Sequence, residues 1–76
     1  MNEEERLKYE AGVLLDFYIT KVLEDDWGNY HNLRMVGRML GRCIKLVELY
    51  SLDNAMTMVN KYKSISFFEM TEKYGK

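Results

Sequence analysis

The fold is decided by residues 32–50, which read NLRMVGRMLGRCIKLVELY. Apolar residues recur in this stretch at intervals of three and four, the period of an α-helix with one buried side. They form a broad apolar arc: Val36, Met39, Leu40, Cys43, Ile44, Val47 and Tyr50. Basic residues recur at the same period on the opposite side. The pattern predicts a helix over residues 32–50 that buries the apolar arc and turns its cations away from the core.

The basic residues of this helix form what we call the cationic row: Arg34, Arg38, Arg42 and Lys45. Residues three or four apart are neighbours on a helix, and like charges at this spacing repel by a few tenths of a kcal/mol per pair. An anionic surface lying against the row would remove that cost. We therefore interpret the cationic row as a partner-binding surface. A solvated helix face that binds nothing is the alternative.

The rest of the chain continues the helical pattern, because it has no proline and only five glycines. Helices are expected at about 3–23, 32–50, 52–63 and 66–74. The tetrapeptide from Ser66 to Glu69 fits a capping box and predicts a break near Ser64. The alternative is a single third helix that continues through Tyr74. The chain is thus predicted to be one all-α domain over residues 1–76, a compact bundle of three helices with a short fourth at the C-terminus.

A second apolar stripe lies on the first predicted helix. Tyr9, Val13 and Phe17 recur every four residues, on the side roughly opposite the positions that face the core. Aromatic residues supply much of the binding energy in interface cores. We interpret this stripe as the self-association surface of a homodimer. The alternative is a central first helix that buries both of its stripes inside the bundle.

Two glycines inside the predicted second helix also need a reason, since each costs about 1 kcal/mol relative to alanine. Gly37 and Gly41 are four residues apart and therefore lie on one side of that helix. Small residues at this spacing let another helix approach the backbone closely. That helix is either the first helix of the same chain or a helix of a second copy, and we include both glycines among the self-association residues.

Length and composition exclude several classes of protein. A chain of 76 residues buries only about 60% of its unfolded surface, so help from a second copy or a partner is expected. The first residues are not a basic stretch followed by an apolar run, so no secretory signal is expected, and no run of roughly eighteen apolar residues would span a membrane. Its single cysteine, Cys43, cannot form an internal disulfide and fits a reducing compartment. A cytoplasmic location is therefore expected.

No pattern in the sequence is typical of an enzyme or a metal site. Asp25 and Asp26 lie near Trp27 and His31, but they lack the helical ligand repetition that such sites usually show. We interpret this segment as a solvated turn. No cofactor, no metal and no small-molecule substrate are expected.

These observations favour a non-enzymatic interaction protein, a regulator of the inhibitor or adaptor type that bacteria and phages encode in short genes. It is expected to form a homodimer and to bind a protein target. The charge is unevenly divided, because residues 1–26 hold eight acidic and three basic side chains, whereas residues 27–50 hold four basic and one acidic. Such a division allows opposite ends to pair between copies, or it steers a charged partner. The alternative is a small dimeric nucleic-acid-binding protein that aligns two basic faces along a phosphate backbone.

Overall fold

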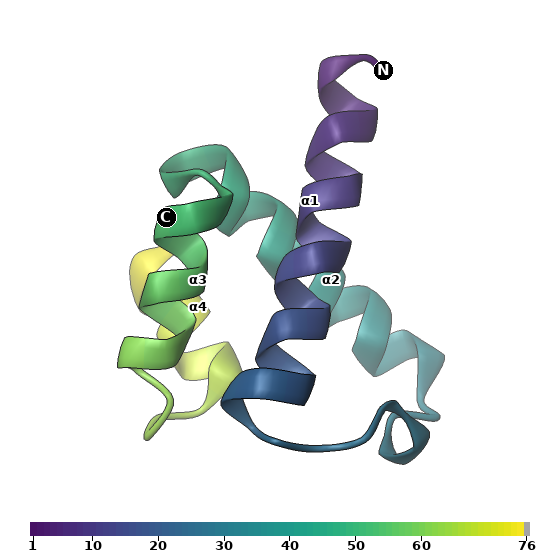
Figure 1. Ribbon diagram of the computed structural model, residues 1–76, viewed down its shortest axis with the longest axis vertical. Coiled ribbons are helices and arrows are strands. Elements are labelled where there is room, and N and C mark those ends of the chain that lie inside the picture. Colours follow the sequence, from purple (N-terminus) through teal and green to yellow (C-terminus); the bar gives the residue numbers. More distant parts are fainter. Residues whose placement is uncertain (76) are drawn as a thin grey trace.

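The structure is a computed structural model that describes residues 1–75, and Figure 1 shows how its α-helices are arranged. The helices are α1 (Glu3–Phe17), α2 (Leu33–Tyr50), α3 (Leu52–Lys61) and α4 (Phe67–Tyr74). A π-helical turn, η1 (Tyr18–Val22), extends α1, and a 3-10 turn, η2 (Trp27–Asn29), precedes α2. No strand occurs among the residues described. The prediction of an all-α fold with three main helices and a short fourth is confirmed.

The most extensive packing in the fold is between α1 and α2, and α1 also contacts α3. Figure 1 shows that the first turns of α1 project past the other helices. The helix begins there because the side-chain oxygen of Asn2 accepts a hydrogen bond from the Glu5 backbone N–H at 2.8 Å. Three glutamates in the first turn also suit the positive end of the helix dipole. From Ala11 onward the inner side of α1 is buried.

The end of the first helix is wider than predicted. The Leu23 N–H donates to the Tyr18 carbonyl oxygen at 2.9 Å, the five-residue spacing of a π-helix. The Asp25 N–H then reaches the Ile19 carbonyl at 2.8 Å, while Glu24 takes a left-handed conformation with φ of 53°. The chain is thus helical over nearly the predicted range of 3–23, but its last turn is π-helical. The sequence did not indicate this, because apolar spacing over five residues does not distinguish the two helix types.

The later helices begin near the predicted residues. Asn32 caps α2 by accepting a hydrogen bond from the Met35 N–H at 3.1 Å. Ser51 alone separates α2 from α3, with φ of 74° and ψ of 161°, a conformation that is essentially reserved for glycine. The third helix ends two residues earlier than expected, and the Ser66 hydroxyl accepts a long 3.5 Å hydrogen bond from the Glu69 N–H at the start of α4. The alternative of one continuous third helix is therefore wrong.

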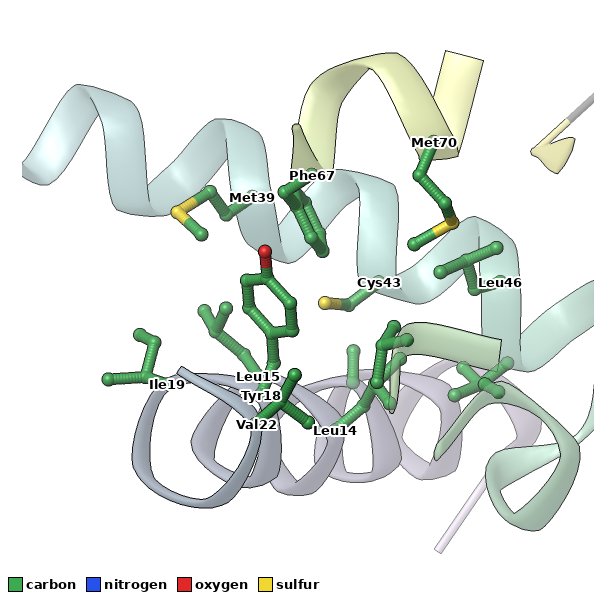
Figure 2. Close-up of a cluster of buried hydrophobic side chains, with 14 residues drawn as sticks. Leu14, Leu15, Tyr18, Ile19, Val22, Met39, Cys43, Leu46, Phe67 and Met70 are labelled. Atoms are coloured by element: carbon green, nitrogen blue, oxygen red, sulfur yellow. The ribbon is translucent and has the colours of Figure 1, made fainter. Parts of the chain in front are cut away.

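One hydrophobic core joins all four helices. Figure 2 shows Tyr18 rising from the end of the first helix toward Phe67 of α4, beside Cys43 of α2. The Tyr18 and Phe67 ring centroids are 4.9 Å apart. The largest fully buried side chains are Leu14, Leu15, Ile19, Leu46, Met70, Val59 and Cys43. Because Phe67 and Met70 belong to this core, α4 is fixed against α2, where the candidate site lies.

Candidate partner-binding site

The cationic row lies along the outer side of α2, but its members have different surroundings. Arg34, Arg38 and Lys45 are exposed, whereas Arg42 is half-buried beside α4. Arg34 and Lys45 form no hydrogen bond or ion pair with any residue in the described range 1–75. The expectation that the whole row turns away from the core is wrong for Arg42, because α4 packs against that part of α2.

Arg42 holds α4 through several polar contacts. Its Nη1 donates to the Phe68 carbonyl oxygen at 3.2 Å and to the Thr71 hydroxyl at 3.1 Å. The same nitrogen lies 3.6 Å from a carboxylate oxygen of Glu72. The Thr71 hydroxyl in turn donates to the Phe67 carbonyl at 2.9 Å, so it is a fixed acceptor. Charge-assisted hydrogen bonds of this kind are stronger than neutral ones, and Arg42 is therefore a structural residue of the monomer.

The ring of Phe68 orients two arginines of the row. The Arg38 guanidinium carbon lies 5.1 Å from the centre of this ring, and that of Arg42 lies 5.3 Å from it. Such cation–π contacts contribute about 0.5–1 kcal/mol at exposed sites. Within residues 1–75, the N–H groups of Arg38 form no hydrogen bond. Arg38 is thus positioned by an aromatic ring, and its N–H donors have no acceptor within residues 1–75.

A groove of about 380 Å³ runs between α2 and the end of α4. Its lining includes Arg38, Gly41, Arg42, Lys45, Thr71 and Glu72. Basic groups outnumber acidic groups in this lining, which favours an anionic ligand group. The contribution of α4 was not foreseen from the sequence. The capping box at Ser66 signals where α4 begins, but nothing in the sequence indicates which side of α2 it packs against.

Gly37 and Gly41 are not packed against another helix in the described chain. A β-carbon added to either residue would have no heavy atom within 4 Å outside the local backbone. The interpretation that the first helix crosses α2 at these glycines is therefore wrong. The physical reason is that α1 packs over the apolar arc, where Met39 and Cys43 are buried. Contact with a second copy stays a prediction.

The apolar stripe of the first helix is only partly available. The Tyr9 side chain is 65% exposed, whereas Val13 and Phe17 are half-buried and Phe17 packs against the core. The alternative of a central helix that buries both stripes is wrong, because Tyr9 faces solvent. Phe17 is not the open aromatic surface that its spacing suggested, since its ring reaches the edge of the core.

Residues 24–30, between the first helix and α2, form what we call the acidic turn. Its carboxylates accept hydrogen bonds from within the turn and so stabilise its conformation. Asp25 accepts hydrogen bonds from the Asp26 backbone N–H, the Asn29 amide and the Tyr30 hydroxyl, and these bonds lower its pKa. The Trp27 indole N–H donates to Asp16 at 2.8 Å. No group of three or more histidine, cysteine or carboxylate side chains within residues 1–75 is placed to hold a metal ion.

The single thiol is enclosed by the core. Cys43 is fully buried, and this burial raises the pKa of its thiol to about 12. The thiolate is the nucleophilic form of cysteine, and at neutral pH this group is therefore protonated and inert.

Comparison with models of protein families, with curated proteins and with solved structures finds no match. Along the described part of the chain, no helix combines the length and apolar content needed to cross a membrane. The function proposed below rests on the geometry and charge of the α2–α4 surface.

Proposed function

We propose that this chain is a non-enzymatic, cytoplasmic interaction protein that binds an acidic surface of a protein partner through the cationic row. A regulatory role, as an inhibitor or adaptor of the kind that bacteria and phages encode in short genes, fits its small size. The observation that carries the proposal is the state of Arg34, Arg38 and Lys45. All of them are exposed, and within residues 1–75 none has an acidic partner.

Electrostatics supports a protein target more than a nucleic acid. The whole chain has a formal net charge of −1, which repels a general polyanion, while the cationic row gives one local positive surface. Complementary charge at an interface increases the association rate and selects among partners. A dimer that aligns two rows along a phosphate backbone is the competing function, and its binding weakens steeply with salt.

The test is a retention experiment with charge variants inside and outside the row. The native chain, a triple variant with Arg34→Glu, Arg38→Glu and Lys45→Glu, and a control with Lys21→Glu are immobilised and exposed to an extract of the native host. Lys21 is exposed on η1, outside the row. We expect the native chain and the control to retain a partner that the triple variant does not retain. Equal retention by all three proteins would contradict the proposal, and a mobility shift on DNA or RNA that only the triple variant loses would replace it with the nucleic-acid function.

Self-association through the outer side of α1 is the second part of the proposal. Tyr9 is a large aromatic side chain exposed to 65%, and half-buried Val13 lies one turn further along the same side. A homodimer would bury both. We expect the native chain to sediment as a dimer and the Tyr9→Glu variant to sediment as a monomer. A native chain that remains monomeric at high concentration would contradict this part alone.

A further inference from the structure

The short helix α4 shows what kind of group the cationic row accepts. Phe68 and Glu72 are four residues apart and therefore lie on one side of α4. The Phe68 ring meets Arg38 and Arg42, and the Glu72 carboxylate lies 3.6 Å from Arg42. An aromatic ring followed by a carboxylate one helical turn later thus contacts Arg38 and Arg42 in the middle of the row.

This internal contact covers only part of the row. Arg34 lies one turn before Arg38, and Lys45 lines the groove about one turn after Arg42. Both side chains are exposed. The row from Arg34 to Lys45 spans about 16 Å at the rise of an α-helix. That length matches about three turns of a second helix laid along it.

The backbone of α2 is open beside the uncovered cations. At Gly37 and Gly41 an added β-carbon would have no heavy atom within 4 Å outside the local backbone, so another chain can approach closely. Between Arg38 and Lys45 the groove of about 380 Å³ continues this open surface as far as α4. The positive lining and the accessible backbone are two separate observations at the same place.

From these contacts we infer that the partner segment is an acidic helix, in which an aromatic residue is followed four residues later by a carboxylate. The inference rests on the proposed function and specifies its partner. Such a helix would lie beside α4 and extend the contact that α4 already makes, with its carboxylates on Arg34, Arg38 and Lys45 and its aromatic ring in the groove. The cations repeat at four, four and three residues, and an i,i+4 pattern on a facing helix has the matching period.

A second copy of this chain fits the row less well than a separate acidic helix does. Two rows facing one another would bring like charges together, because Glu48 is the single acidic residue of α2. The Phe68 and Glu72 side chains of a second copy already contact Arg42 of their own chain. The acidic segment 1–26 of a second copy would attract the row, but none of its aromatic residues, Tyr9, Phe17 and Tyr18, is followed four residues later by a carboxylate. A partner of different sequence therefore fits the row better.

The test compares helix-forming peptides of about 18 residues, labelled with a fluorescent dye. One carries phenylalanine and glutamate at i and i+4, and its matched control has the same composition with the two residue types at i and i+2. Fluorescence anisotropy with the full chain is expected to show about tenfold tighter binding of the first peptide, and about tenfold weaker binding of that peptide to Arg38→Glu. The Lys21→Glu variant should bind as the native chain does.

Each other outcome has a defined meaning. Equal affinity for the two peptides would overturn this inference and leave the proposed function intact, because acidic charge alone would then suffice. No binding of either peptide would overturn this inference, and equal retention of host proteins by all three immobilised proteins would in addition remove the proposed function. A native dimer that Arg38→Glu dissociates in sedimentation would make the occupant a second copy, and this outcome also contradicts the inference.

Discussion

The inner and outer sides of α2 are stabilised by different interactions. On the inner side, Met39, Cys43 and Leu46 are buried against the other helices, and the stabilisation comes from removing apolar surface from water. On the outer side, a few polar atoms of Arg42 and the ring of Phe68 hold α4. Apolar burial is spread over many contacts, whereas the arginine contacts depend on single atoms. The two sides should therefore respond differently to substitution, pH and salt.

The largest effect is expected on the inner side. Leu46 is fully buried, so Leu46→Ala should lower the free energy of unfolding by about 2–5 kcal/mol through lost apolar contact and the cavity that remains. Leu49 lies on the same helix with 45% of its surface exposed, and Leu49→Ala should cost less than about 1 kcal/mol. Urea unfolding followed by circular dichroism measures both. If Leu46→Ala does not fold, the milder Leu46→Val should still cost about 1 kcal/mol. Similar losses at the two positions would show that the core is not where we place it.

A smaller loss is expected when the outer side loses Arg42. Arg42→Ala removes the hydrogen bonds to the Phe68 carbonyl and the Thr71 hydroxyl together with the ion pair to Glu72, and it should cost about 1–3 kcal/mol. The loss should be accompanied by faster hydrogen exchange in α4 than in α1. Arg34→Ala is the matched control, because Arg34 forms no hydrogen bond, ion pair or ring contact within residues 1–75 and should change stability by less than about 0.5 kcal/mol. Equal effects of the two substitutions would mean that α4 is not held by Arg42.

High pH should lower the free energy of unfolding through a group on the inner side of α2. Burial raises the pKa of Cys43 from 9.0 to about 12, so the folded state keeps its proton when the unfolded state has lost it. Stability from this group is fully present below pH 9 and is lost as the pH rises toward 12, by about 1 kcal/mol at pH 10. Urea midpoints measured at pH 8 and pH 10 should fall less in Cys43→Ala, which has no thiol to titrate. The same decrease in both proteins would contradict the buried thiol as its source.

The smallest effect should have the opposite sign. Gly37→Ala places a methyl group in open space on a helix, and the free energy of unfolding should rise by about 0.5–1 kcal/mol. At Gly75 the same change would collide with the Thr71 carbonyl oxygen, so Gly75→Ala should not stabilise and should loosen the end of α4. Thermal unfolding distinguishes the two variants. A loss of stability in Gly37→Ala would reveal a close contact at that glycine.

The inner side of α2 was predictable from the sequence, and the outer side was predictable only in part. Apolar spacing locates Met39, Cys43 and Val47 in the core, since the helical period alone decides which residues share a side. The role of Arg42 depends on where α4 packs, and that position is set by Phe67 and Met70 entering a core built from all the helices. No local pattern contains this information.

Some details of the backbone could not be predicted from the sequence for a similar reason. The π-helical turn at the end of the first helix changes hydrogen bonding without changing which residues are apolar. The open surroundings of Gly37 and Gly41 follow from the path of α1, which the spacing of the two glycines does not specify.

The central claim is that the outer side of α2, together with α4, is a recognition surface for an acidic helix. An NMR titration of the isotopically labelled chain with the peptide carrying phenylalanine and glutamate at i and i+4 tests it most directly. Amide shifts should change along α2 from Arg34 to Lys45 and in α4 near Phe68 and Glu72, and they should disappear in Arg38→Glu. Changes confined to α1 or to the acidic turn, or no changes at saturating peptide, would contradict the claim.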